Sequence, residues 1–340
     1  MLNSIRSLYA FCSSQPATFL PLFGAISVCL LDIIFTGSVN LTDPTFNLID
    51  NKKESSITTF ASQTGNLEII VDEFKNRLLY YFSELTVTFF FLITILVSAY
   101  SIYISLREAK IKNIPLIFAF IIIIGLGLFT FAFYNYKTYA LMENLLNALE
   151  RYSQVPVSLI NRIQHGISLF TILFLVTAFC AVLINDEGSG KQAAKLLRAE
   201  RLRLKTLLYL GAALLVSGVA AIYFSDRWMG HMPAEIFISN DANKAVAEIG
   251  NIHTTVKGFF YTLLLLSIYI PAALVFQLRG ESLYFAENHE GTIEHKNKWM
   301  EENGISLTLK ESFAHTAALF APLLTGLSGS VMEIIKTTFA

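Results

Sequence analysis

The stretch LTVTFFFLITILVSAYSIYI, residues 85–104, decides the fold of this chain. It carries no charge and is dense in Phe, Ile, Leu and Thr. At about 1.5 Å of rise per residue, a helix of this length crosses the roughly 30 Å hydrocarbon core of a bilayer. Residues 67–78 upstream place apolar side chains at helical spacing without Pro or Gly. The sequence therefore predicts one helix that crosses a membrane and protrudes several turns beyond it.

The composition of the whole chain is that of a membrane protein. Of its 340 residues, 54% are hydrophobic and 15% are charged, whereas a soluble domain carries about a quarter charged residues. The net charge of -1 provides no global field that would recruit nucleic acid. The three cysteines, Cys12, Cys29 and Cys180, form no visible disulfide or zinc framework.

Segments long and apolar enough to be spans occur six times. They are residues 18–37, 85–104, 114–133, 167–184, 206–224 and 259–277. Each is expected to be a helix, because an isolated strand cannot satisfy its backbone in lipid. The first segment is of full length and contains Pro21 and Asp32, which favours a retained span over a cleaved signal peptide. We predict an all-α membrane protein with six transmembrane helices in three hairpins, extended by helical segments on the extracytoplasmic side.

The distribution of Lys and Arg predicts the orientation of these hairpins. If the N-terminus is cytoplasmic, the short inner loops, 105–113 and 186–205, hold nine Lys and Arg, and the three much longer outer loops hold ten. The positive-inside rule then places both termini in the cytoplasm. We expect an integral multipass protein of a plasma or bacterial inner membrane.

The chain after the sixth span divides into two predicted parts. Residues 280–305 are polar, and we expect an irregular cytoplasmic linker between a membrane domain, 1–279, and a tail, 306–340. In the tail, Thr308 and Glu311 have the spacing of a helix-capping box.

The tail is predicted to be a cytoplasmic amphipathic helix. Pro322 and Gly326 argue for a bend in its middle, and its polar residues make it a poor seventh span. Its apolar residues recur at steps of three and four, and those expected to pack are Phe313, Phe320, Leu324, Leu327 and Val331. We expect this helix to lie on the inner membrane face or to pack against other tails.

Two acidic residues are candidates for an ion or proton site. Asp32 lies well inside the first span, and Glu84 lies where the second span enters the apolar layer. Their depths nearly match on consecutive helices, so the two carboxylates could face each other and bind a cation or carry protons. In the alternative interpretation, Glu84 reaches outer water and Asp32 accepts hydrogen bonds from a neighbouring helix.

A basic helix precedes the fifth span. Lys191, Lys195, Arg198 and Arg201 follow one another at three- and four-residue steps. They could contact anionic lipid headgroups or a cytoplasmic partner, and the alternative is ordinary anchoring of the topology.

No catalytic constellation and no metal or cofactor site is apparent in the sequence, and the Glu and His residues near His289 and His295 lack a helical zinc spacing. The leading hypothesis is a non-enzymatic oligomeric protein, either a homo-oligomer or a subunit of a membrane complex. It would form or gate a channel-like path through the membrane, or scaffold a complex. The alternatives are a cation- or proton-coupled transporter that uses Asp32 and Glu84, and, less favoured, a membrane enzyme that acts on lipids.

Overall fold

The computed structural model describes residues 19–38, 67–111, 113–135, 147, 149–151, 153–184, 191–231, 240–287, 293–305 and 309–339. Within these ranges every regular element is a helix, as the sequence predicts. In chain order the helices are α2 (Leu20–Ser38), α4 (Leu67–Glu108), α5 (Ile114–Asn135), α7 (Val157–Val182), α8 (Lys191–Gly230), α9 (Asn240–Glu287), α10 (Ile293–Glu302) and α11 (Leu309–Phe339).

Five of the described helices, α4, α5, α7, α8 and α9, are long and apolar enough to cross a membrane. The part of α2 that was assessed, Leu20–Cys29, is apolar but shorter. By length and composition the chain is thus an all-helical multipass membrane protein. The six-span topology stays a prediction.

Helix α4 confirms the long helix predicted around residues 85–104. It is unbroken over 42 residues, which corresponds to about 63 Å at 1.5 Å per residue. That length is about twice the thickness of the hydrocarbon core.

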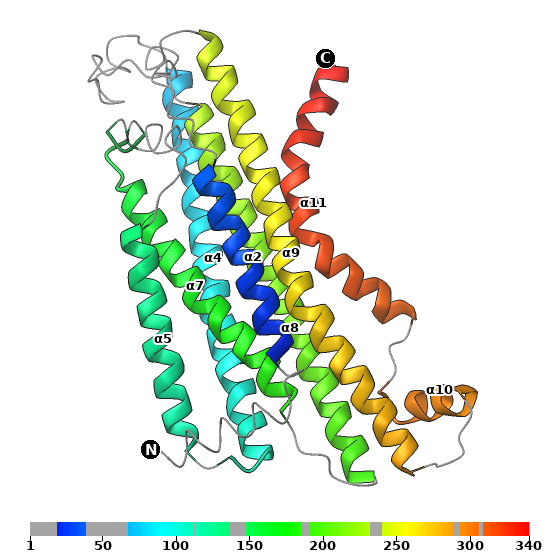
Figure 1. Cartoon of the computed structure of the whole chain (residues 1–340). Helices are drawn as coiled ribbons and strands as arrows, with labels where there is room; N and C mark the ends of the chain where they lie inside the picture. The colour runs from blue at the N-terminus through cyan, green and yellow to red at the C-terminus, as the bar shows by residue number, and fades with distance from the viewer. Residues whose placement is uncertain are drawn as a thin grey trace.

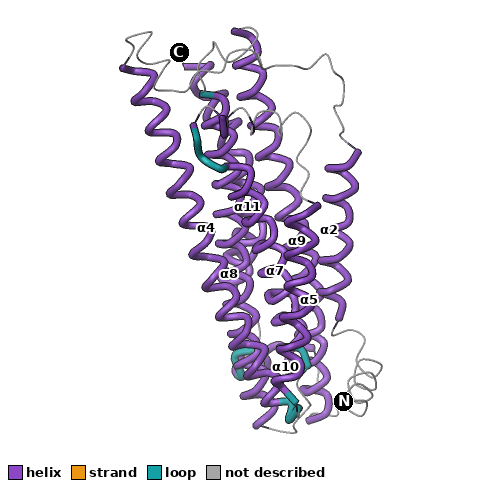
Figure 2. The backbone as a smooth tube through the Cα atoms, turned by 90° about the vertical axis from the view of Figure 1, so that its left-hand side faces the viewer, coloured by secondary structure: helices purple, strands orange, loops and turns teal. Residues whose placement is uncertain are grey.

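The long helices pack side by side in one elongated bundle (Figures 1 and 2). Helix α8 packs on both α9 and α4, α7 packs on α4 and α5, and α2 packs on α9. The core is apolar, and Phe179, Leu207, Leu208 and Leu265 are completely covered in it. We call the end of the bundle beside α10 the α10 end, and the other end the far end.

The outward faces of α4 and α5 carry large apolar side chains. Phe89, Leu92 and Leu96 of α4, like Phe120 and Ile123 of α5, are all more than half exposed. A soluble protein rarely exposes so much continuous apolar surface, whereas lipid tails are as apolar as these side chains. The surface of the bundle therefore agrees with a membrane environment.

The structure corrects the expectation that residues 280–305 are irregular. Helix α9 continues into this segment, and α10 occupies much of the rest. The Trp299 ring lies 5.6 Å from that of Tyr284 on α9, and Met300 and Ile305 are buried. Burial of these few apolar side chains stabilises the helical structure of this segment, which its polar composition does not predict.

Helix α11 packs along α9 and α8 of its own chain. It runs antiparallel to α9, and its last residues lie at the far end of the bundle, opposite the start of α2 (Figure 1). The sequence instead predicted a tail on the inner membrane face or against other tails, with both termini on one side.

Candidate functional site

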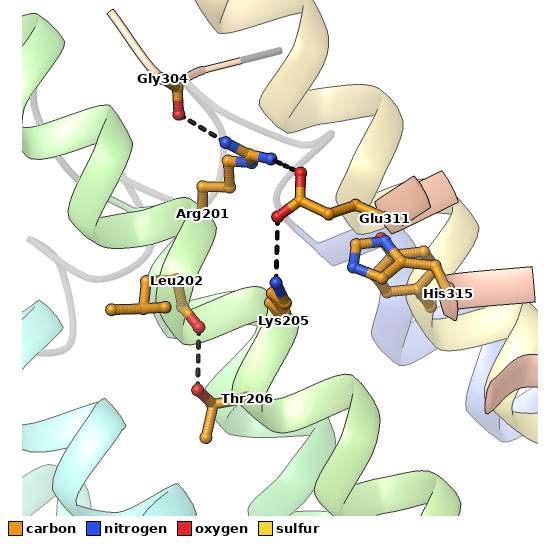
Figure 3. A network of polar contacts seen from close by, with 8 residues as sticks. Arg201, Leu202, Lys205, Thr206, Gly304, Glu311 and His315 are labelled. Carbon is orange, nitrogen blue, oxygen red and sulfur yellow. Dashed lines mark hydrogen bonds and ion pairs between the residues drawn. The ribbon is translucent and has the colours of Figure 1, made fainter. Parts of the chain in front are cut away.

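The most elaborate polar contacts of the bundle join α8, α9 and α11, and we call the residues that make them the α11 anchor: Arg201, Lys205, Tyr269, Glu311 and His315. The Glu311 carboxylate lies between two cations of α8 (Figure 3). Lys205 donates to it at 3.0 Å, and Arg201 donates to its other oxygen. Arg201 also donates to the carbonyl of Gly304 at 2.6 Å.

His315 lies one helical turn after Glu311, so both side chains occupy the same face of α11. His315 is buried, with 5% of the residue exposed. Its Nδ1 shares a hydrogen bond of 2.7 Å with the Tyr269 hydroxyl of α9, and the Tyr209 ring of α8 lies 5.6 Å away. Glu311 and Nδ1 of His315 thus have polar partners on the neighbouring helices α8 and α9.

Pro322 breaks the regular hydrogen bonding of α11 where the helix bends. A proline inside a helix removes one N–H donor and displaces the carbonyl one turn before it. The next amide, that of Leu323, donates to the Thr262 hydroxyl of α9 at 3.0 Å. At the bend predicted from the sequence, a side chain of the neighbouring helix α9 therefore accepts a hydrogen bond from the backbone of α11.

Beyond the bend, α11 approaches α9 backbone to backbone. A Cβ atom on Gly326 would lie 2.9 Å from the Thr254 carbonyl, and one on Gly258 would lie 2.7 Å from the Pro322 carbonyl. Both distances are too short for a side chain. Thr255 also donates to the Gly326 carbonyl at 3.2 Å. Small residues at such positions are typical of closely packed membrane helices.

A buried ion pair joins α8 to α9 near the α10 end. The Glu200 side chain is fully covered, and Arg279 donates to it at 3.0 Å. The same guanidinium nitrogen is 3.5 Å from the Leu183 carbonyl that follows α7. The pair thus connects the ends of three helices.

A second polar cluster lies at the far end. Asp226 of α8 is buried, accepts a hydrogen bond from Thr254 at 3.2 Å and lies 3.0 Å from Nδ1 of His253. Close by on α8, the Trp228 ring packs 5.3 Å from Tyr80 of α4.

The face of α4 that points into the bundle carries a series of small hydroxyl side chains, which we call the hydroxyl row. Its members are all buried and are Ser83, Thr94, Ser98, Ser101 and Ser105. From Thr94 onward the steps are four, three and four residues, which keeps the hydroxyls on one side of the helix. At the α10 end the row meets Arg203, which donates to Ser105 at 3.4 Å and forms a two-pronged ion pair with Glu108 at 2.6 and 2.5 Å.

An apolar layer interrupts the hydroxyl row between Ser83 and Thr94. Val87 and Phe91 of α4 are buried there with Leu214 and Ala221 of α8. On the inward face of α4, hydroxyls therefore lie on both sides of this layer, and on the α10 side they alternate with the buried Ile102 and Leu106.

The two predicted acids lie on different helices of the bundle. Asp32 lies on α2, which packs on α9 and α7, whereas Glu84 is half-buried on α4, which packs mainly on α8 and α7. The side chain of Asp32 lies outside the described residues. The facing pair of carboxylates stays a prediction.

The four basic residues predicted to contact lipid headgroups or a partner have different surroundings in the structure. Arg201 belongs to the α11 anchor, and Lys195 and Arg198 are exposed. The side chain of Lys191 lies outside the described part of the chain. Binding of lipid headgroups or of a partner stays a prediction for the exposed pair.

The predicted packing stripe of the tail faces away from the bundle. Phe313, Phe320, Leu324 and Leu327 are exposed, and the side chain of Val331 lies outside the description. The residues that pack on α8 and α9 are instead His315, Leu319, Pro322 and Gly326. The apolar pattern of the sequence does not reveal this face, because Leu319 is its only large apolar member among these four residues.

Among the described residues, no group of three or more His, Cys, Asp and Glu is placed to hold a metal. The ion pairs described above join side chains on different helices, so their visible role is to hold helices together. Comparison with known proteins finds no matching family model, curated protein or solved structure.

Proposed function

We propose that the protein is a non-enzymatic, channel-like membrane protein whose path for water and protons follows the inward face of α4, against α7 and α8. One observation carries the proposal, namely the hydroxyl row and the apolar layer that divides it. Hydroxyls and charged ends can hydrate a path from both sides, and an apolar constriction gates by excluding water. The packing described here is then the closed state.

The register of α4 and α8 supports a layer in the middle of the path. Tyr80 meets Trp228 toward the far end, and Ser105 meets Arg203 toward the α10 end. Both pairs fit one antiparallel register, in which Phe91 and Leu214 fall near the centre of the predicted second and fifth spans. The apolar layer would thus lie at the depth where the barrier to water is highest.

Replacing Phe91 by serine should open this layer. The hydroxyl row would become nearly continuous, so we expect proton flux through proteoliposomes to rise by about tenfold or more, which corresponds to roughly 1.4 kcal/mol of barrier. Phe89→Ser provides a matched control, because Phe89 is on the same helix but 57% exposed. The measurement is the decay of a pH gradient followed with an entrapped dye.

Equal flux through both variants and the wild type would contradict the path. A second function, scaffolding of a membrane complex, would then be favoured, together with the oligomer predicted from the sequence. The outward apolar faces of α5 and of the first half of α11 support it, because they offer surface for other membrane helices.

These contacts favour a topology in which α11 is a seventh helix that crosses the membrane, beside the six predicted spans. At one end Glu311 meets Lys205, which directly precedes the fifth predicted span. At the other end Gly326 meets Thr255, just before the sixth predicted span begins. Between them α11 rises about 22 Å at helical pitch, and its exposed side chains Phe320 and Leu324 would face lipid.

Labelling with an impermeant thiol reagent tests this topology. After removal of the native cysteines, Gln154→Cys, at an exposed position, should react from outside, and Glu302→Cys on α10 should not. A tag at the C-terminus should be accessible from outside as well. A tag accessible only from inside would support the earlier prediction that α11 lies on the inner membrane face. Labelling of position 302 from outside would overturn the predicted orientation.

A further inference from the structure

Two members of the hydroxyl row differ from other hydroxyls in the bundle. Ser and Thr side chains in these helices commonly donate to the carbonyl one turn before them, as Thr177 does to Leu173 at 2.7 Å. The hydroxyls of Thr94 and Ser98 do not. Both residues are completely buried, and their oxygens have no hydrogen-bond partner among the described residues. A buried hydroxyl without a partner is destabilising, and in native proteins such groups are usually bound to ordered water.

These two hydroxyls lie on the α10 side of the apolar layer. In the register of α4 and α8, Thr94 falls at the level of Leu214 and Ser98 at that of Leu210. On the parallel helix α7, Thr171 is also completely buried. Phe90 and Ile167 both pack against the apolar layer, and Thr94 and Thr171 each follow one of them by one helical turn on two helices that pack on each other.

Two neighbouring helices thus contribute three buried hydroxyl oxygens, with Ser98 one helical turn, about 6 Å, beyond Thr94. Thr171 uses its proton toward Ile167 at 2.8 Å, which leaves its oxygen free to accept. Thr94 and Ser98 can each donate and accept. A buried water needs two to four polar partners, and this set provides them. With no carboxylate in the set, a neutral water suits these oxygens better than a resident cation does.

We propose that Thr94 and Ser98, with Thr171, form a binding site for internal water between α4 and α7, beside the apolar layer. The site itself follows from the paired buried hydroxyls. Its role as the first hydration point on the α10 side of the gate rests on the proposed function.

Hydroxyl-radical labelling by X-ray irradiation tests the site, because radicals generated from bound water modify the side chains next to it. The full-length protein in lipid nanodiscs should be modified faster at Leu214, which is 3% exposed, than at Leu264, which is 4% exposed in the apolar core. In the double variant Thr94→Val, Ser98→Ala, that excess should be lost. Thr130→Val is the matched control, since Thr130 is exposed on α5 and already bonded to Leu126.

A wild type that shows no excess modification overturns the water site, and so does an excess that persists in the double variant. Thr94→Ser guards against misfolding, because it keeps the hydroxyl and should keep the excess. Radical labelling tests the water site, and proton flux tests the proposed path. The labelling excess could depend on the hydroxyls while proton flux does not respond to Phe91→Ser. That result would support the water site and contradict the path.

Discussion

Arg279→Ala is expected to lower the free energy of unfolding by about 3–5 kcal/mol, because it leaves the fully covered Glu200 carboxylate without its ionic partner. The charge cannot be rehydrated without separating α8 from α9. The measurement is unfolding of the purified protein in a denaturing detergent, followed by circular dichroism.

Replacing both partners distinguishes the buried charge from the loss of side-chain volume. Glu200→Met with Arg279→Met should restore most of the stability, since buried pairs are often replaced by apolar residues at little cost. Lys298→Ala serves as the control, because Lys298 and Glu302 are 4.0 Å apart and mostly exposed, so little change is expected. A double variant as unstable as the single one would show that packing, and not the unpaired charge, dominates.

The second large effect is expected at the contact between α9 and α11. Gly326→Leu would place its Cβ 2.9 Å from the Thr254 carbonyl, so the helices must separate. Overpacking of this kind costs about 1–3 kcal/mol. Because that cost falls on α11, its backbone amides should exchange with deuterium roughly five- to a hundredfold faster, which mass spectrometry of the segment 311–328 would show.

Gly127→Leu is the matched control for this change. Gly127 also lies within a helix, α5, but a Cβ atom there would meet nothing within 4 Å. Exchange in α11 should stay as in the wild type. Unchanged exchange in Gly326→Leu as well would mean that α11 does not pack on α9 in the membrane, and both the α11 anchor and the seventh crossing would lose their support.

The buried and half-buried ion pairs of the bundle connect its helices to one another. Glu200 with Arg279 and Asp226 with His253 join α8 to α9, and Glu311 with Lys205 joins α11 to α8. Such pairs stabilise a specific arrangement of helices, because separating them in lipid would expose unpaired polar groups. The hydroxyl row of α4 is uncharged, and it supports the proposed path.

The sequence by itself determined the helices. Whether a segment such as residues 85–104 forms a membrane-length helix depends on its own length, its apolar content and the need to satisfy its backbone in lipid. The bend in α11 was predictable for the same reason, since Pro322 lacks the amide hydrogen wherever the helix packs. The polar linker 280–305 was misjudged because a few buried side chains, Trp299 among them, outweigh the average composition of the segment.

Only the tertiary structure decided which polar residues meet. Glu311 and Arg201 are 110 positions apart, and no local pattern relates a tail carboxylate to a guanidinium on a distant helix. The hydroxyl row shows the same on one helix: Thr86 and Thr88 are exposed, whereas Thr94 and Ser98 are buried. Threonine thus occurs on both faces of α4, and the side on which α7 and α8 pack decides which threonine is buried. Insertion into a membrane is a property of each segment, whereas pairing is a property of neighbours that the chain acquires only when the helices assemble.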